Sequence, residues 1–238
     1  MLSSRKRDFL VLLSAPVGFG AMLIVAAVLH NRQLGKDLYA ENGPIELPTF
    51  LFLVGACVLA MVAAWRLWRQ DRDILKTGAL VGFALGCFFV GGEEVAWGQW
   101  FVPYQTPEGW AEMNAQGEMT LHNLDGLQGK SEVLRVVFGL GGLAGLLLLF
   151  WKRLRVVAPP VALAPWFLLI ALFGAGELVT DWVTLPIEVV HDGLRGKLFS
   201  ELQELAIAGV ALAYGISVFH RALPSLASGQ ARLKSQST

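Results

Sequence analysis

Residues 79–94 have the sequence ALVGFALGCFFVGGEE, a long apolar run that ends in two adjacent glutamates. A helix that crosses the roughly 30 Å hydrocarbon core of a bilayer needs about 20 mostly apolar residues. This run therefore predicts a membrane-spanning helix whose far end reaches water. Charged side chains at such a position are costly unless they are paired, solvated or used, so Glu93 and Glu94 mark a candidate functional site.

The composition of the whole chain favours the same class of protein. Of the 238 residues, 55% are hydrophobic and 16% are charged, and the formal net charge is zero. Soluble domains have about a quarter of their residues charged. Cys57 and Cys87 both lie in apolar runs, where we expect buried, unpaired thiols. The N-terminus resembles a signal peptide, but its apolar run is too long for one, so we expect a retained first span.

Six apolar stretches are long enough to cross a bilayer. We predict an all-α, polytopic membrane helical bundle of about six transmembrane helices, formed by residues 1–220 as a single domain and followed by a disordered cytoplasmic tail at 221–238. Ser200 is expected to cap the last helix. Recurring glycines predict close helix packing; they are Gly78, Gly82, Gly86, Gly141, Gly142, Gly145, Gly174 and Gly176. The predicted spans are residues 9–30, 47–68, 77–97, 133–151, 160–184 and 200–220.

Lys and Arg residues concentrate at one set of span ends, which the positive-inside rule places in the cytoplasm. Of the acidic residues, only Asp8, Asp71 and Asp73 lie on that side, so the opposite face is acidic. We therefore predict cytoplasmic N- and C-termini, a location in the cell inner membrane, and a polar site that faces the periplasm. The basic residues are Arg5, Lys6, Arg7, Arg66, Arg69, Arg72, Lys76, Lys152, Arg153, Arg155, Arg221, Arg232 and Lys234.

Ionisable residues from several segments are predicted to meet at the outer face. Residues three or four apart share one face of a helix, so such pairs can address one ligand. Carboxylates and histidine that project from bundle helices hold metals in di-metal proteins. Two carboxylates in unequal environments can also act as general acid and general base. Besides Glu93 and Glu94, the pairs are Glu118 with His122, Glu177 with Asp181, and Glu201 with Glu204.

The outer loop between the third and fourth spans, residues 98–132, is too long for a simple connection. Its aromatic residues argue against disorder, and residues 107–119 predict a short amphipathic helix. Thr106 is expected to cap this helix, with Pro107 in its first position. We interpret the loop as a lid that lies over the outer mouth of the bundle.

These patterns give three sets of candidate site residues. The structural alternatives stay open, since Glu201 and Glu204 could be ordinary helix-start acids and His122 an interfacial histidine. The candidate catalytic residues are Glu93, Glu94, Glu118, His122, Glu177 and Asp181. The candidate substrate-binding residues are Trp97, Gln99, Gln116, Asn123 and Glu204. A divalent metal is the candidate cofactor, and its hypothesised ligands are Glu93, Glu118, His122 and Glu177.

The motif E-E-x-x-W-G-Q, followed by T-P-E and N-x-Q-x-E-x-x-x-H-N, resembles a family of bacterial multi-pass membrane proteins whose function is uncharacterised. The resemblance covers about 30 of the 238 residues and implies only a multi-pass inner-membrane protein. The chain can also be compared with membrane zinc hydrolases such as the alkaline ceramidases, whose metal site has three histidines. This chain offers only His122 and His191 on the outer side, so its sequence does not match that metal site. The matching residues are Glu93, Glu94, Trp97, Gly98, Gln99, Thr106, Pro107, Glu108, Asn114, Gln116, Glu118, His122 and Asn123.

Three classes of function fit these observations. The leading hypothesis is a membrane-embedded hydrolase- or transferase-like enzyme, metal-assisted or acid–base, that acts on a lipid or lipid-linked substrate at the outer leaflet. The alternatives are a non-catalytic assembly or sensor partner in the envelope, and a transporter for a cation or small solute. Nucleic acid is not an expected partner, because the basic residues are scattered anchors without a dense run.

Overall fold

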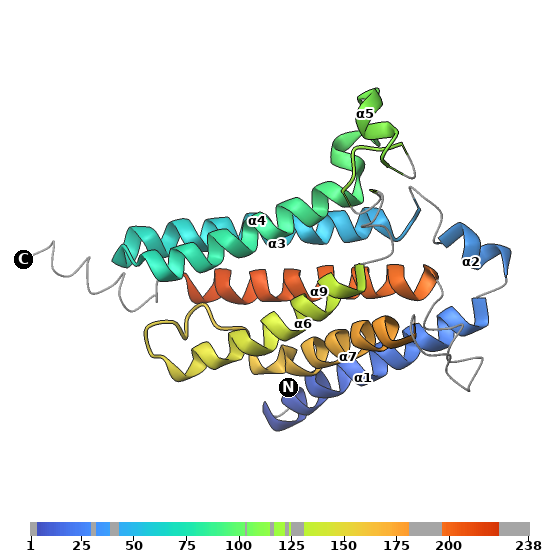
Figure 1. Ribbon diagram of the computed structural model, residues 1–238. Helices are drawn as coiled ribbons and strands as arrows, with labels where there is room; N and C mark the ends of the chain where they lie inside the picture. The colour runs from blue at the N-terminus through green and yellow to red at the C-terminus, as the bar shows by residue number, and fades with distance from the viewer. Residues whose placement is uncertain are drawn as a thin grey trace, which may run out of the picture.

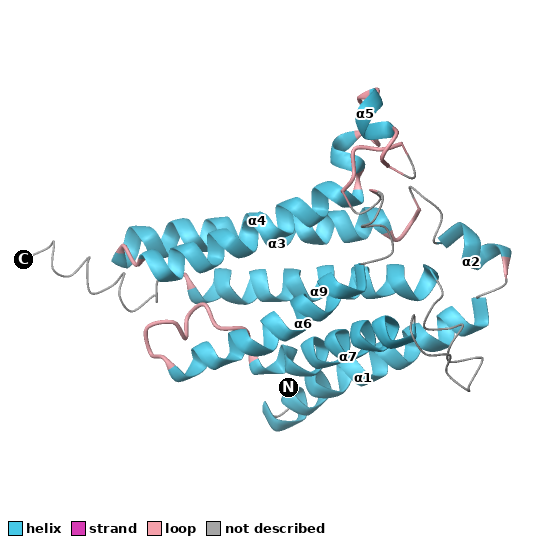
Figure 2. Ribbon diagram, viewed as in Figure 1, coloured by secondary structure: helices cyan, strands magenta, loops and turns pink. Residues whose placement is uncertain are grey.

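A computed structural model describes residues 4–29, 32–38, 43–102, 104–114, 117–121, 124, 131–180 and 197–223. Among these residues every regular element is helical, and the only strand-like pairing is an isolated bridge between Asn114 and Leu124 (Figure 2). Of the predicted tail at 221–238, Arg221 belongs to the last helix and residues 224–238 lie outside the described residues. The α-helices are α1 (Ser4–Leu29), α2 (Gln33–Leu38), α3 (Glu46–Asp71), α4 (Ile74–Glu94), α5 (Glu108–Ala111), α6 (Ser131–Gly145), α7 (Ala164–Thr180) and α9 (Lys197–Arg221). The 3-10 helices are η1 (Ala96–Gly98), η2 (Leu146–Phe150) and η3 (Val161–Leu163).

Five helices in the described part of the chain are long and apolar enough to cross a membrane. The prediction of an all-helical bundle with long apolar helices is therefore confirmed. The first predicted span coincides with α1, whose described apolar stretch, Leu13–Leu29, is shorter than the other five. A count of six spans and the orientation of the termini stay predictions. The five helical stretches are Glu46–Asp71, Ile74–Glu94, Glu132–Phe150, Val161–Val179 and Lys197–Arg221.

The long helices run side by side and form two groups (Figure 1). Helix α3 packs against both α4 and α9, whereas α6 packs against α7, which also contacts α1. One apolar core joins α1, α7 and α9 through Phe19, Phe167 and Phe199. Cys87 is buried and Cys57 half-buried, and both thiols are free, as predicted. Helix α9 thus lies between the groups and touches residues of both.

Glycines allow α6 and α7 to approach closely. A β-carbon on Gly139 would lie 2.6 Å from the carbonyl oxygen of Phe167, and one on Gly142 would overlap the Phe167 ring. Gly174 lies against Arg135 and the backbone of Glu132. The prediction of close helix packing is confirmed at Gly142 and Gly174, whereas Gly145 lies against the ring of Pro159, which is outside any helix. It is wrong among the described residues for a second set, around which a β-carbon would meet no described atom within 4 Å: Gly78, Gly82, Gly86, Gly141 and Gly176.

The helix ends differ from the predictions at several points. Helix α4 ends at Glu94, and the chain turns there because Ala96, Trp97 and Gly98 all have positive φ angles. Thr106 is not a cap, since α5 is a single turn that begins after Pro107. The predicted helix over 107–119 is therefore wrong, because the chain beyond α5 forms bends and a bridge. Ser200 is not a cap either, because α9 already begins at Lys197.

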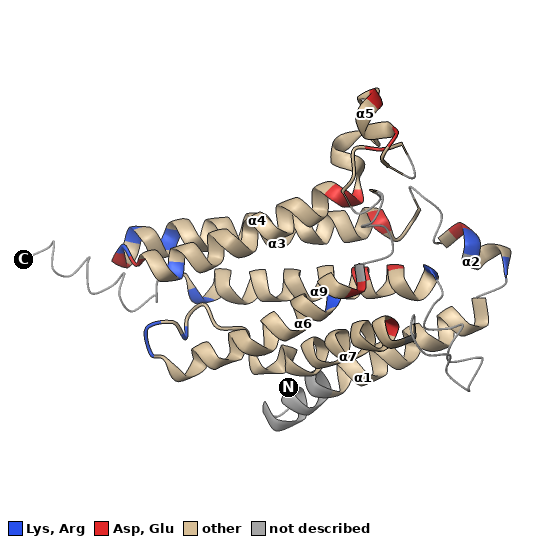
Figure 3. Ribbon diagram, in the orientation of Figure 1, with Lys and Arg blue, Asp and Glu red and all other residues tan. Residues whose placement is uncertain are grey.

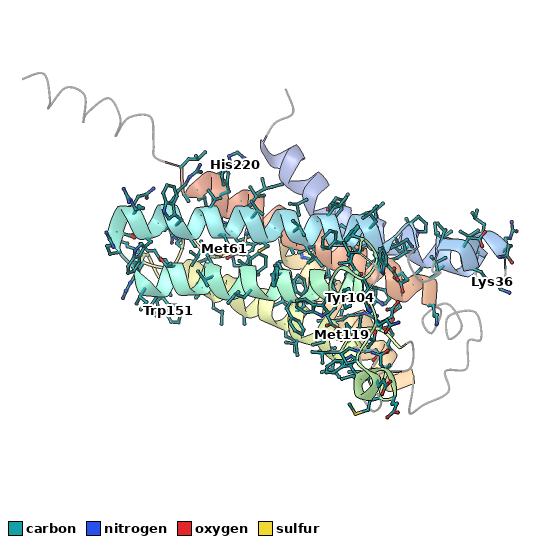
Figure 4. All side chains as sticks on the ribbon, turned by 90° about the horizontal axis from the view of Figure 1, so that it is seen from above. Lys36, Met61, Tyr104, Met119, Trp151 and His220 are labelled. Carbon is teal, nitrogen blue, oxygen red and sulfur yellow. The ribbon has the colours of Figure 1, made fainter. Side chains whose placement is uncertain are left out.

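Lys and Arg residues gather mainly at one end of the bundle, and Asp and Glu residues mainly at the other (Figure 3). Figure 4 shows Trp151 and His220 toward one end and Lys36 at the other. We call the first the basic end, defined by residues 65–76, 151–157 and 217–221. There Asp73 caps α4 by accepting from the backbone N–H groups of Leu75 and Lys76, and Arg153 donates to the same carboxylate. The hydrogen bond from Arg153 holds the pKa of Asp73 well below its usual value.

Candidate functional site

The opposite end of the bundle gathers carboxylates from four helices (Figure 3). They lie where α3 and α9 begin and where α4 and α7 end, so the chain ordering of the spans brings them to one level. Glu94, at the end of the third predicted span, interacts electrostatically with Glu201 and Glu204 of the sixth, and Glu204 shares Arg135 with Glu177 of the fifth. We call this the acidic end, and we define it by Glu46, Glu93, Glu94, Glu177, Glu201 and Glu204.

A buried arginine organises one part of the acidic end. The side chain of Arg135, on α6, is 2% exposed. Its Nη1 donates to Glu177 Oε2 on α7, and its Nη2 donates to Glu204 Oε1 on α9 at 2.8 Å. Nη2 also donates to the hydroxyl of Ser200. This Arg135 network links three helices through charge-assisted hydrogen bonds, which are the strong class of hydrogen bond in proteins.

Gln203 completes the Arg135 network. It is fully buried, and its Nε2 donates to Glu177 Oε1 at 2.5 Å. Ser200, Gln203 and Glu204 share one face of α9 because they are three and four residues apart. Both oxygens of Glu177 are therefore bonded, one by Arg135 and one by Gln203. These contacts give Glu177 a role in joining α6, α7 and α9.

A second group of carboxylates lies next to this network. Glu94, at the end of α4, interacts electrostatically with Glu204, Glu201, Glu46 and Glu93. Glu201 also interacts electrostatically with Glu204 and Glu46. We call Glu46, Glu94, Glu201 and Glu204 the carboxylate cluster. Within the described part of the chain, the basic side chains whose charges act on Glu201 are Arg135 and Lys197.

Glu93 holds the outer loop. It is 8% exposed, and its Oε1 accepts from the indole Nε1–H of Trp97 at 2.7 Å. Its Oε2 accepts from the backbone N–H of Leu121 at 2.6 Å. The Trp97 ring also lies directly over Gly92, where a β-carbon would be 2.9 Å from it. Glu93 is thus bonded to residues on both limbs of the loop.

Polar side chains inside the loop continue this arrangement. Gln99 donates from Nε2 to the hydroxyl of Thr106 at 2.9 Å and accepts at Oε1 from the N–H of Met119 at 2.8 Å. Buried Asn114 donates to the carbonyl of Thr120 at 2.7 Å. Figures 1 and 4 both show α5 beside the outer part of α4. The described loop therefore forms a structure of its own that projects sideways from the bundle.

The predicted site residues fall into three places. Glu94, Glu177 and Glu204 lie together at the acidic end. Glu93, Trp97 and Gln99 form the base of the loop, and the backbone N–H of Glu118 is bonded to Asn114 Oδ1 at 3.2 Å. The remaining candidates lie outside the described residues: Gln116, His122, Asn123 and Asp181.

The hypothesised metal site depends on His122 and so is not tested. Among the residues that the structure describes, no three His, Cys, Asp or Glu side chains are grouped so as to hold a metal ion. Glu118 is also not on a helix, so it and His122 do not share a helical face as the spacing suggested. Glu93 and Glu177, two of the hypothesised ligands, belong to separate hydrogen-bond networks.

Sequence reasoning missed Arg135, Ser200 and Gln203. Arg135 carried a usable signal, because it is the only charged residue in the apolar run 133–151. An ionisable residue inside a span defaults to a functional or paired role. Ser200 and Gln203 carried none, because both residue types are common near helix starts and only the fold shows their shared face.

These features define the chain as an all-helical protein with five helices long and apolar enough to cross a membrane, and with a charged network at one end. This is the architecture of a helical membrane protein. No protein-family model, curated protein or solved structure matches the chain. The function of the protein must therefore be inferred from the side chains at the acidic end.

Proposed function

We propose that the protein is a membrane-embedded enzyme that performs general acid–base chemistry at the acidic end, on a lipid or lipid-linked substrate from the outer leaflet. The observation that carries this proposal is the carboxylate cluster, which brings side chains from α3, α4 and α9 around partly buried Glu94. Carboxyl groups crowded in a low-dielectric site share protons rather than all ionising. Such sharing provides an acid and a base side by side.

Within the cluster we assign the acid–base roles to Glu94 and Glu201. Among the described residues, no hydrogen bond or ion pair engages either carboxylate. Glu177 and Glu204, by contrast, are fixed by Arg135. A residue that exchanges protons with a substrate must be able to reach it, whereas a carboxylate bonded to a guanidinium is held in place.

The opposite end of the bundle favours an enzyme over a transporter. A transport route needs polar groups along the whole path. Toward the basic end, α3, α4 and α9 instead pack through an apolar cluster that includes Leu67, Leu80 and Val218. Among the described residues, the buried acidic side chains therefore gather at the acidic end and do not continue along the helices to the basic end.

One observation favours a second candidate, a non-catalytic envelope partner. The loop exposes Phe101, Val102 and Met113, with 57%, 68% and 52% of each residue accessible. Exposed apolar groups on an ordered loop suit a docking surface. In that case the carboxylates at the acidic end would stabilise the fold without taking part in a reaction.

The test uses the full chain reconstituted in proteoliposomes with a total membrane lipid extract. Mass spectrometry of the lipids compares the wild-type protein with empty vesicles and with two variants, Glu94→Gln and Glu201→Gln. We expect the wild-type protein to convert one lipid class and both variants to lose turnover by at least about 100-fold, the range of a single acid–base group. Glu112→Gln, a change on the exposed loop, is the matched control and should keep full turnover.

The proposal is wrong if the wild-type protein alters no lipid, or if both amide variants turn over lipid at the wild-type rate. Elemental analysis of the same preparations, together with His122→Ala, addresses the metal-assisted form of the mechanism. Loss of a bound divalent metal in His122→Ala would identify His122 as a metal ligand and support a metal-assisted reaction. Normal turnover in that variant and no stoichiometric metal would leave acid–base chemistry alone.

A further inference from the structure

A groove opens between α3 and α4 near the basic end. Its volume is about 330 Å³, which is within the usual size range of small-molecule sites. The groove is far from the carboxylate cluster along the helices, so the proposed function does not use it. Its lining residues are Met61, Ala64, Trp65, Trp68, Thr77 and Val81.

The groove faces away from the bundle. Met61 is 44% exposed and Trp65 is 62% exposed. Figure 4 shows Met61 between α3 and α4 on the outer side of this helix pair. Gly78 and Gly82, next to the groove on α4, meet no other atoms where a side chain would be. Since α3 and α4 are both candidate spans, an occupant of this apolar groove enters from the hydrocarbon of the bilayer.

Positive charge lies at the tryptophans that line the groove. The guanidinium of Arg69 is 6.0 Å from the centroid of the Trp65 ring, and that of Arg72 is 5.2 Å from the Trp68 ring. Each pair is four residues apart; Arg69 lies in the last turn of α3, and Arg72 is the left-handed residue that ends this helix. Among the described residues, no carboxylate forms an ion pair with Arg69 or Arg72.

The acidic residues nearest to these arginines are already neutralised. Asp71 is paired with Lys76, and Asp73 is paired with Lys76 and Arg153. The four charges balance, so Arg69 and Arg72 leave this corner of the molecule net positive. Thr77 adds a hydroxyl on the groove wall that is buried and has no hydrogen-bond partner among the described residues.

We propose that the groove binds one anionic phospholipid, with an acyl chain along Met61 and Val81 and the phosphate at Arg69 and Arg72. The apolar walls suit a hydrocarbon chain, and tryptophans mark the level of the lipid headgroups. Guanidinium groups recognise phosphate with two parallel hydrogen bonds. The cytoplasmic leaflet, to which basic span ends belong, is also the one that carries anionic lipid.

The test is native mass spectrometry of the full-length protein in detergent with added lipid. Phosphatidylglycerol and phosphatidylcholine with identical acyl chains are the two probes, so that only the headgroup charge differs. We expect one phosphatidylglycerol to be retained about 25-fold more tightly than phosphatidylcholine, since each of the two arginines near the headgroup contributes about a fivefold effect.

Two variants test the two halves of the site. Arg69→Gln with Arg72→Gln should abolish the preference for phosphatidylglycerol, whereas Val81→Trp should block the groove and weaken both lipids. Lys152→Gln, which removes a basic residue that does not line the groove, is the matched control and should keep the preference. All variants are compared with the wild-type protein for helix content by circular dichroism.

Equal retention of both lipids by the wild-type protein overturns the proposal. So does a preference that survives the double arginine change, or one that Lys152→Gln removes equally. A dimer that carries no lipid would show that a second copy of the chain covers the groove, which also overturns it. Because the groove and the carboxylate cluster share no residue, a failure here leaves the acid–base proposal untouched.

Discussion

At the basic end Arg153 meets Asp73 with 58% of its side chain exposed, whereas at the acidic end Arg135 meets Glu177 with only 2% exposed. Exposed ion pairs contribute little because water screens both charges. A buried pair gains more attraction, but each member becomes very costly if its partner is removed. An arginine–carboxylate ion pair is therefore a surface contact at the basic end, whereas at the acidic end it is a buried contact that holds helices together.

This difference explains where chemistry can occur. At the basic end the charges around Asp73 balance, and an apolar cluster closes the bundle directly beneath them. At the acidic end there are more carboxylates than cations, and Arg135 satisfies only two of them. The excess charge of the carboxylate cluster is the feature that a purely structural role does not require.

The largest effect is expected from Arg135→Met. The change leaves buried Glu177 and half-buried Glu204 without their cation, so we expect a loss of about 3–5 kcal/mol in the free energy of unfolding. Denaturant unfolding in detergent, followed by tryptophan fluorescence, measures this. Arg153→Met at the basic end is the matched control and should change stability far less.

A compensated variant sharpens the same comparison. Arg135→Met combined with Glu177→Leu and Glu204→Leu removes all three charges, so much of the lost stability should return. If Arg135→Met alone is as stable as the wild-type protein, Arg135 does not stabilise the packing of α6, α7 and α9. The proposed difference between the two ends of the bundle would then be wrong.

A smaller effect is expected from Glu93→Ala. The indole N–H of Trp97 and the backbone N–H of Leu121 lose their acceptor, and each unsatisfied group costs about 1–3 kcal/mol when buried. The loop should therefore become sensitive to limited proteolysis between residues 98 and 124. Glu93→Gln keeps one acceptor oxygen and should protect the loop better; equal cleavage in wild-type and Glu93→Ala proteins would contradict the contacts described.

Gly174→Ala tests how tightly α6 and α7 are joined next to the Arg135 network. The new β-carbon would lie 3.1 Å from the β-carbon of Arg135 and 3.2 Å from the carbonyl oxygen of Glu132. We expect a loss of about 1 kcal/mol, at the low end for overpacking. Gly176→Ala, on the same helix with open space around it, should be neutral or slightly stabilising in the same thermal unfolding measurement.

The smallest effect is expected at the basic end, from Asp73→Asn. The pKa of Asp73 is lowered by Arg153, so its charge stabilises the folded state at every pH above the ordinary aspartate value of about 3.9. The difference in Tm between the wild-type protein and the variant should be a few degrees, constant from pH 8 to 5, and should shrink as the pH falls below about 4. A difference that instead grows in acid would contradict this ion pair.

Much of the fold was accessible from the sequence because a membrane span has a strong local signal. The apolar run before Glu93 ends within three residues of its predicted limit, and the spans from α3 onward begin within three residues of theirs. The acidic end was also predictable from the sequence. Successive spans cross the membrane in opposite directions, so carboxylates at the end of one span and at the start of the next lie on the same side. What escaped was pairing, because Arg135 and Glu177 are 42 residues apart and nothing local joins them.

The loop shows the same limit of local information. Its aromatic residues predicted an ordered segment, and hydrogen bonds hold its described part. The contact to the bundle was not predictable, because Glu93 accepts from the backbone N–H of Leu121 and every non-proline residue carries that group. The glycines of α4 and α6 illustrate it as well. Both helices carry repeated glycines, yet among the described residues a β-carbon would meet a neighbour at Gly91, Gly92, Gly139, Gly142 and Gly145 but not at Gly78, Gly82, Gly86 or Gly141. The difference depends on what the fold places opposite each glycine.

The corner after α4 has a consequence for how events on the loop reach the bundle. Ala96 and Trp97 hold left-handed backbone angles of 44° and 53° in φ, conformations that cost about 1–3 kcal/mol each in residues with a β-carbon. Such a corner resists bending, and Trp97 is bonded across it to Glu93. The loop therefore leaves the bundle at a strained turn that begins two residues after Glu94. A change in the loop that lets this turn relax would act beside the carboxylate cluster.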